Sequence, residues 1–365
     1  MGRLFRWFSR PLLALQDSEK AHSRSLLLLR LASSNPIFRG VLRFFYKPRK
    51  SLETTCFDLE FSHPFGLAAG MDKRAEALRG WESIGLAFSE IGGVTMLEQS
   101  GNPKPRMFRH GQDRALVNRM GFNNPGSEKI VERLRRAGEQ TIPIWANLGK
   151  SKRTPLDEAK DDYSTSLTRL WPFIDLFVIN VSSPNTPGLR ELQHGEHLKG
   201  ILDECQKANR TCAKQNDAPE KPLLIKVAPD LSTTELESIL DMAISCGIDG
   251  IIATNTTVER PNTTHKAYKE QGGCSGSPLR QQSTEMIRHI YAYTNGTLPI
   301  VGVGGIMNAE DAWDKITAGA TLLQAYAGFV FEGPGLTKSI VNGLTKRLKE
   351  SGYSSIAEAV GSSHK

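Results

Sequence analysis

The sequence has 365 residues, of which 39% are hydrophobic and 23% are charged. These fractions are ordinary for a soluble globular protein and exclude a disordered chain, a collagen-like repeat and a coiled coil. The length fits one large domain or two ordinary ones, and α/β barrels of about 250 residues fold as a single unit.

The net charge of +7 is concentrated at the N-terminus. Residues 1–50 contain eleven Lys or Arg and two acidic residues, which leaves the remaining 315 residues with a net charge of −2. A body of this charge argues against a nucleic-acid-binding surface. The basic N-terminal segment instead predicts attraction to an anionic surface.

The cysteine and histidine patterns predict neither a disulfide framework nor a metal site. Five cysteines occur without a CxxC motif, which is typical of buried thiols in a reducing compartment. His194 and His197 have a spacing that metal ligands can have, but no third ligand is evident, so we expect both to be solvated.

The first 50 residues predict a helical, membrane-associating extension. No apolar run is long enough to span a bilayer, and Arg6 and Arg10 interrupt the stretch that a signal peptide would need. The spacing predicts a first helix with one apolar face, formed by Leu4, Phe8, Leu12 and Leu15. A second helix is expected over 22–32, followed by a basic linker over 33–50. Two such helices are typical of a hairpin that lies on a membrane. The alternative is an arm that packs on its own barrel or on a dimer partner.

The body of the chain, residues 51–350, repeats one unit eight times: a short apolar run, a loop and an amphipathic stretch. The runs are 64–69, 88–92, 142–147, 176–180, 223–227, 250–253, 300–303 and 321–324. Helices are expected at 72–84, 126–137, 195–214, 232–246, 281–294 and 309–318. Eight strand–helix units predict an α/β fold, a closed (β/α)8 TIM barrel, with residues 351–365 as a C-terminal tail. An open doubly wound sheet is the alternative, but its GxGxxG signature is missing.

Polar residues follow nearly every expected strand, where barrel enzymes hold their active sites. One such residue is usually a cap or a turn residue, but the repeated pattern predicts a pocket rich in amides and lysines, suited to a planar anion. Gly304-Gly305 and Ala327-Gly328 stand where barrels commonly bind phosphate. Lys226, in the middle of a strand, could place a cation beside a flavin, so we expect bound FMN.

Several motifs resemble the membrane-associated, quinone-reducing class of the dihydroorotate dehydrogenase family. They are GLAAGMDK (66–73), GNPKPRMFR (101–109), NRMGFNN (118–124), NVSSPNTPGLR (180–190), ATNTT (253–257) and GVGGI (302–306). The resemblance implies FMN-dependent oxidation of (S)-dihydroorotate to orotate in pyrimidine biosynthesis. Electrons would then pass to a membrane quinone.

The resemblance also implies roles for individual residues. Ser183 would remove the C5 proton while C6 delivers hydride to flavin N5; the soluble classes have a cysteine at this position. Lys73 would pair with the substrate carboxylate. The remaining substrate-binding residues would be Asn118, Arg119, Met120, Gly121, Phe122, Asn180, Asn185, Asn255 and Thr256. Flavin-binding positions would be Ala69, Gly70, Met71, Asp72, Lys73, Gly93, Asn147, Asn180, Lys226, Thr254, Gly276, Gly305, Tyr326 and Ala327. Arg109 and Tyr326 would lie on the quinone path.

These expectations describe a peripheral protein on the cytoplasmic face of the inner cell membrane, with no metal and no nucleic-acid partner. The sequence leaves the oligomeric state and the quinone type open. A soluble relative that uses fumarate or NAD, a tRNA-modifying flavin barrel and a membrane-tethered scaffold without activity are the other hypotheses. The −2 charge of the body argues against the tRNA-modifying barrel.

Overall fold

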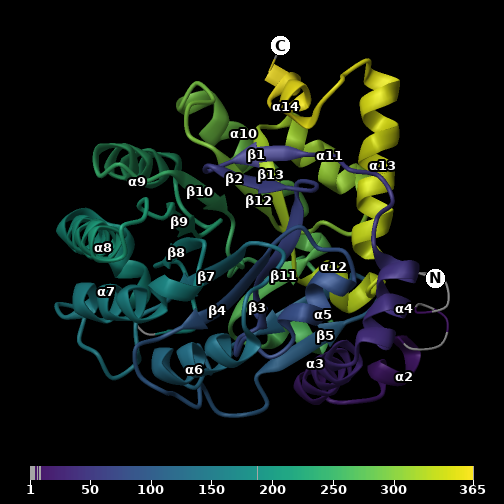
Figure 1. Ribbon diagram of the computed structural model, residues 1–365, viewed down its shortest axis with the longest axis horizontal. Helices are drawn as coiled ribbons and strands as arrows, with labels where there is room; N and C mark the ends of the chain where they lie inside the picture. The colour runs from purple at the N-terminus through teal and green to yellow at the C-terminus, as the bar shows by residue number, and fades with distance from the viewer. Residues whose placement is uncertain (1–4, 6, 8–9, 187, 365) are drawn as a thin grey trace.

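The computed structural model describes residues 5, 7, 10–186 and 188–364, and its centre is a closed barrel of eight parallel strands (Figure 1). Around the barrel the strands follow the order β10-β12-β13-β3-β4-β7-β8-β9. In chain order they are β3 (Phe65–Asp72), β4 (Ser89–Val94), β7 (Ile144–Leu148), β8 (Leu176–Asn180), β9 (Leu223–Val227), β10 (Gly250–Ala253), β12 (Ile300–Val303) and β13 (Ala320–Ala325). Each strand overlaps one of the eight predicted apolar runs, so the predicted TIM barrel is confirmed.

An outer ring of helices covers the barrel, because strands buried on both faces need a helical layer outside them. Five helices lie within one residue of the predicted bounds: α6 (Ser127–Ala137), α8 (Gly195–Gln215), α9 (Thr233–Ser245), α10 (Arg280–Tyr293) and α11 (Ala309–Thr317). The ring also contains α7 (Ala159–Leu170) and α13 (Leu336–Ser351). The C-terminal residues continue as α14 (Ile356–Ala359), whose Ile356 and Ala359 are buried.

The helix expected over 72–84 is wrong in its first half. Strand β3 continues to Asp72, and α5 occupies only Leu78–Ser83. Asp72 organises the intervening loop, since its carboxylate accepts hydrogen bonds from the backbone N–H of Glu76 at 2.8 Å, the backbone N–H of Ala77 at 2.9 Å and the indole N–H of Trp81 at 3.1 Å. The two backbone bonds satisfy the N–H groups of Glu76 and Ala77, which have no helical partner in this loop.

Two antiparallel additions were not predicted. The hairpin of β1 (Thr54–Cys56) and β2 (Leu59–Phe61) lies at the N-terminal end of the barrel, where Phe61 contacts the stacked rings of Phe88 and Trp145. A second sheet, in the order β11-β6-β5, joins β5 (Met107–His110), β6 (Ala115–Asn118) and β11 (Gly273–Gly276). The hairpin therefore seals one end of the barrel core, and the second sheet extends the opposite end.

The described part of the N-terminal segment contains three helices: α2 (Arg10–Ala14), α3 (Ser18–Ser34) and α4 (Pro36–Tyr46). They gather beside α5 and β5 (Figure 1). The basic linker expected over 33–50 is wrong for most of its length. The Asn35 side chain accepts a hydrogen bond from the Ile37 N–H at 2.8 Å, and Pro36 fits the first helical position, so α4 begins directly after α3. Leu4 and Phe8 of the expected first helix lie outside the described residues.

The N-terminal helices are amphipathic. Leu26 and Ala21 of α3 are buried, and Leu29 packs so closely on α5 that a Cβ at Gly80 would lie 2.6 Å from it. The other faces expose a continuous series of large apolar side chains, namely Leu27, Leu28, Leu31, Ile37, Phe38, Val41, Phe44 and Phe45. Among the described residues, we find no helix with the length and hydrophobicity that crossing a membrane requires.

Candidate active site

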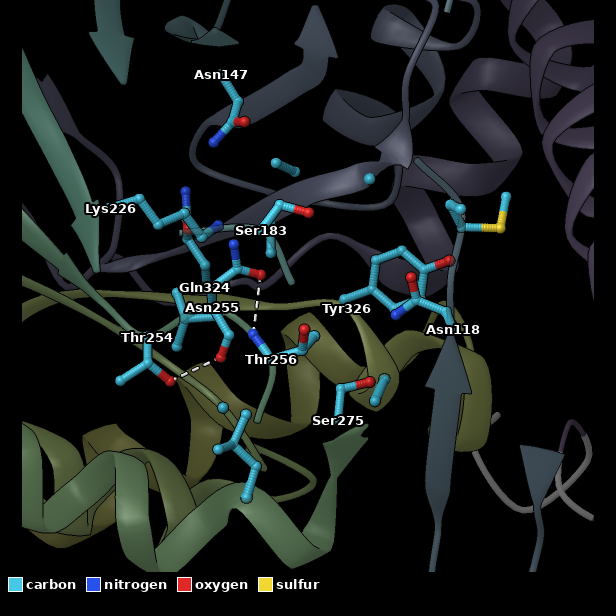
Figure 2. Close-up of a pocket in the computed structure, with 18 of the residues that line it drawn as sticks. Asn118, Asn147, Ser183, Lys226, Thr254, Asn255, Thr256, Ser275, Gln324 and Tyr326 are labelled. Atoms are coloured by element: carbon cyan, nitrogen blue, oxygen red, sulfur yellow. Dashed lines mark hydrogen bonds between the residues drawn. The ribbon is translucent and has the colours of Figure 1, made fainter. Parts of the chain in front are cut away.

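A cavity opens at the carboxyl ends of the barrel strands, where polar side chains from several strands converge (Figure 2). Asn147 comes from the end of β7, Lys226 from β9 and Gln324 from β13. Asn118 and Ser275 reach the same space from the second sheet. The barrel thus brings together residues that lie far apart in the sequence.

An amide network lines the floor of the cavity. The Asn180 side chain donates to Asn147 Oδ1 at 2.8 Å, and its own Oδ1 accepts from Ser182 Oγ at 3.1 Å and from Asn255 Nδ2 at 3.3 Å. Asn185 Nδ2 donates to Asn118 Oδ1 at 3.3 Å on the opposite wall. Because each amide is oriented by another, the donors and acceptors are fixed before a ligand binds.

A fully buried carboxylate, Glu90 of β4, supports this network from below. Its Oε1 accepts from Asn147 Nδ2 at 2.6 Å, and its Oε2 accepts from the Ala69 N–H at 3.2 Å and lies 3.8 Å from Lys226 Nζ. The carboxylate offsets the cost of burying the Lys226 ammonium. Glu90 therefore contacts three of the predicted flavin-binding positions, although the sequence analysis did not identify it.

Lys73 stands at the edge of the cavity, and its ammonium donates to the Gly70 carbonyl at 2.8 Å. Desolvation lowers the pKa of Lys73 to about 8, while Glu19 opposes this shift and Arg106 adds to it. An ammonium with so few partners is suited to bind a ligand carboxylate, which would stabilise its charged form.

Ser183 lies in the loop after β8 and is buried, and its Oγ accepts from the Asn185 N–H at 3.3 Å. The hydroxyl of Thr186 in the same loop is buried and has no hydrogen-bond partner among the described residues. Arg190 holds the loop by donating to the Ser182 carbonyl at 3.3 Å and to Asp230 Oδ2 at 2.9 Å. The serine therefore lies in a loop that Arg190 holds in place, and the same loop contains the buried Thr186 hydroxyl.

The cavity has features that fit a phosphate group and a flat ring. Gly276 and Gly305 have positive φ, and a Cβ at either would lie within 2.5 Å of neighbouring protein atoms, so only bare backbone fits beside the ligand space. The N-terminus of α12 (Ala327–Glu332) faces the same space through Ala327 and Gly328. Both polar side-chain atoms of Gln324 are buried and have no partner among the described residues. These glycines and the orphaned amide fit a phosphate and a heteroaromatic ring.

Two predicted quinone-path residues meet the N-terminal helices. Arg109 of β5 donates to the Leu13 carbonyl at 2.9 Å, and the ring of Tyr326 stacks on His22 of α3 with centroids 6.3 Å apart. Desolvation lowers the pKa of His22 to about 3, with a smaller contribution from Lys73, so the ring is neutral. Sequence reasoning missed His22, because nothing in a helical histidine indicates that it packs on a residue following the eighth barrel strand.

Most of the predicted site residues line this one cavity. The substrate set there contains Lys73, Asn118, Met120, Gly121, Phe122, Asn180, Ser183, Asn185, Asn255 and Thr256. The flavin set there contains Ala69, Gly70, Lys73, Gly93, Asn147, Asn180, Lys226, Thr254, Gly276, Gly305, Tyr326 and Ala327.

Three residues of the predicted substrate and flavin sets do not line the cavity. Arg119 points outward, where it pairs with Glu270 at 2.7 Å and lies over the Phe108 ring. Asp72 caps its own loop, and the Met71 side chain belongs to the hydrophobic core. All three neighbour cavity residues in the chain, but their side chains point elsewhere.

The fold and the cavity define a (β/α)8-barrel protein with a cavity lined by amides and lysines at its strand ends. The sequence pattern of the dihydroorotate dehydrogenase family matches residues 51–348. A protein from Gloeobacter violaceus named dihydroorotate dehydrogenase (quinone) is 48% identical over 97% of this chain and 97% of its own. One of the same name from Thermosynechococcus vestitus is 50% identical over 93% of this chain and 96% of its own.

Solved structures agree with this assignment. The dihydroorotate dehydrogenase of Eimeria tenella, crystallised with ferulenol, is 34% identical and superposes with a TM-score of 0.87 over 95% of this chain and 96% of that one. The chain therefore belongs to the dihydroorotate dehydrogenase family, as its sequence motifs predict. Members of this family are flavoproteins.

Proposed function

We propose that this protein oxidises (S)-dihydroorotate to orotate with FMN as its cofactor and passes the electrons to a membrane quinone, as a step of pyrimidine biosynthesis. The observation that carries the proposal is that one cavity holds Ser183, Lys73 and five asparagines beside the buried Lys226–Glu90 pair. The names of the relatives, which specify quinone, support the acceptor.

Substrate recognition is assigned to Lys73 and the asparagines. Lys73 pairs with the substrate carboxylate, since a compact ammonium with one carbonyl partner has donors to spare. Asn118, Asn180, Asn185 and Asn255 hydrogen-bond the ring amides, donating to carbonyls and accepting from N–H groups. Thr256 and the backbone of 118–122 complete the cradle.

Ser183 is assigned the role of base at C5. An isolated serine hydroxyl is a weak base, so it must pass its own proton on as it receives the one from C5. The Thr186 hydroxyl, buried and unpartnered among the described residues, is suited to relay that proton toward solvent. This arrangement removes the need for an ionised serine.

FMN, when bound, supplies the acceptor for the hydride that leaves C6. The backbone at Gly276, Gly305 and Ala327 would hold its phosphate, and Lys226 would lie near the pyrimidine edge of its ring, where negative charge develops. Asn147, Thr254 and the Ala69–Gly70 backbone would orient that ring. Glu90 holds Lys226 and Asn147 in place from below.

We assign membrane association to residues 1–50. Exposed apolar side chains on α3 and α4 alternate with basic residues such as Arg30, Arg39 and Arg43, a combination that favours an anionic lipid surface. Arg109, Tyr326 and His22 join these helices to the flavin cavity and would form the quinone path. The basic segment favours the anionic cytoplasmic leaflet of the cell membrane.

A comparison of electron acceptors tests this proposal. The purified full chain is supplied with dihydroorotate together with a short-chain quinone, fumarate or NAD, and orotate formation is followed. We expect turnover with the quinone and little with the other two. Faster turnover with fumarate or NAD would assign the protein to a soluble class and would overturn the quinone assignment.

A further inference from the structure

A second cavity lies on the rim of the barrel, between α3 and the loops that follow β3 and β4. It encloses about 660 Å³, which is ample for a small organic anion. We call it the rim cavity. Glu19, His22 and Leu26 of α3 form one wall, and Lys104 and Arg106 stand on the wall beside it.

The rim cavity is strongly cationic. Six basic side chains and three carboxylates line it. Each carboxylate already has a basic partner within the cavity: Glu19 pairs with Arg106 at 2.7 Å, Glu98 with Lys129 at 2.5 Å, and Glu76 with Arg133 at 3.5 Å. The excess positive charge belongs to Lys73, Arg74 and Lys104, although Lys104 also lies 3.5 Å from Glu19.

The rim cavity adjoins the flavin cavity. Lys73 and Met120 line both spaces, so the ammonium assigned to the substrate carboxylate stands at their boundary. The outer wall is rigid, because Arg106 binds both carboxylate oxygens of Glu19 and also donates to the carbonyls of Ser100 and Asn102. Asn102 in turn donates to the carbonyl of Asn185 in the Ser183 loop at 3.0 Å.

We propose that the rim cavity is the entrance through which the dihydroorotate anion reaches Lys73 and through which orotate leaves. The inference rests on the function proposed above. A cleft lined by charges of one sign focuses its field and raises the local concentration of the opposite ion. Arg74 and Lys104, both exposed, would attract the carboxylate at the mouth, and Lys73 would receive it at the inner end.

An entrance differs from a binding site in its kinetics. Charges that act only along the path change the association and dissociation rates of orotate together, whereas charges that touch the bound ligand change the equilibrium constant. The double variant Arg74→Gln/Lys104→Gln therefore separates the two roles. Its matched control is Arg210→Gln/Lys214→Gln, which removes two exposed cations from α8 on the far side of the barrel (Figure 1).

Stopped-flow binding of orotate to the FMN-loaded protein, followed by flavin absorbance, gives both rates. At low ionic strength we expect the double variant to lose about 3- to 10-fold in both rates, with Kd changed by less than about twofold. The loss should vanish near 0.5 M salt, where the Debye length falls to about 4 Å. The control should match the unmodified protein.

A steric variant provides a second test that does not depend on charge. Ser23 is exposed on α3 and lines the rim cavity, so Ser23→Trp would narrow it without touching the flavin cavity. We expect both orotate rates to fall in this variant at every salt concentration. Unchanged rates in both variants, or a raised Kd with an unchanged association rate, would overturn the proposal that the rim cavity is the entrance. If the unmodified protein binds no orotate at all, the proposed function itself fails.

Discussion

The shifted pKa of Lys73 makes a quantitative prediction about how ligand affinity depends on pH. Desolvation lowers this pKa to about 8, and the nearby Glu19 carboxylate opposes the shift. Only the charged ammonium can pair with a carboxylate, so the ligand binds the protonated form and raises the pKa of Lys73 when bound. Affinity should therefore be constant below pH 7 and should fall as the pH rises through 8.

The size of the effect follows from the pKa itself. With a free pKa of about 8, the orotate Kd should be about twice its low-pH value at pH 8 and about 11 times that value at pH 9. Lys73→Met removes a charge-assisted hydrogen bond worth about 1.5–3 kcal/mol, so its affinity at pH 7 should fall by about 10- to 150-fold. Its remaining affinity should no longer depend on pH in this range.

Titration of the FMN-loaded protein with orotate between pH 6.5 and 9.0, followed by flavin absorbance, measures these values directly. Lys104→Gln serves as the control, because it removes a neighbouring cation that is not assigned to the bound ligand. A Kd that stays flat to pH 9 in the unmodified protein would show that the Lys73 ammonium does not bind the orotate carboxylate. So would a Lys73→Met variant that still loses affinity above pH 8.

Three further predictions concern the base, the buried carboxylate and the membrane face. Ser183→Ala should retain FMN but slow flavin reduction by dihydroorotate about 100-fold or more, in stopped-flow measurements, because general base catalysis is lost. Glu90→Gln should raise the flavin midpoint potential by about 30 mV, since the lysine beside it is no longer neutralised. Replacing exposed Leu28, Phe38 and Phe44 with Ser should reduce pelleting with anionic vesicles and quinone turnover, but not flavin reduction.

Each of these variants has an outcome that would contradict its assignment. Near-normal flavin reduction in Ser183→Ala would show that Ser183 is not the base that removes the C5 proton. An unchanged or lower potential in Glu90→Gln, measured with a reference dye, would show that the carboxylate does not act on the flavin. The triple variant is compared with Ile244→Ser, which removes an exposed apolar side chain from α9, and equal pelleting of the two would argue against the membrane face.

The barrel could be predicted because each of its strands is recognisable from its own residues. Strands buried on both faces read as continuous apolar runs, and all eight are present in the sequence. The second sheet gave no such signal, since β6 pairs with β11 from a distant part of the chain and each strand has only four residues. Helix α4 was missed because its arginines resembled a basic linker, whereas in the structure Asn35 and Pro36 start a helix.

The site was predictable from polar residues at the ends of strands and from Lys226, a lysine inside an apolar strand, but two other buried polar residues within strands were missed. Asn147, Asn180 and Asn255 were expected from their positions at strand ends. Glu90 and Gln324 lie inside apolar strands. Gln324 lines the cavity, and Glu90 contacts the cavity residues Asn147 and Lys226, because side chains alternate in direction along the strands of the closed barrel. Motif resemblance identifies positions but does not give the direction of a side chain, as the outward-pointing Arg119 illustrates.

An anaerobic titration of the purified, flavin-containing protein with (S)-dihydroorotate tests the central claim most directly. We expect the absorbance of oxidised flavin to disappear with about one equivalent of dihydroorotate per flavin, and one orotate to form for each flavin reduced. Flavin that stays oxidised in excess dihydroorotate, while chemical reductants still bleach it, would show that the protein does not oxidise dihydroorotate.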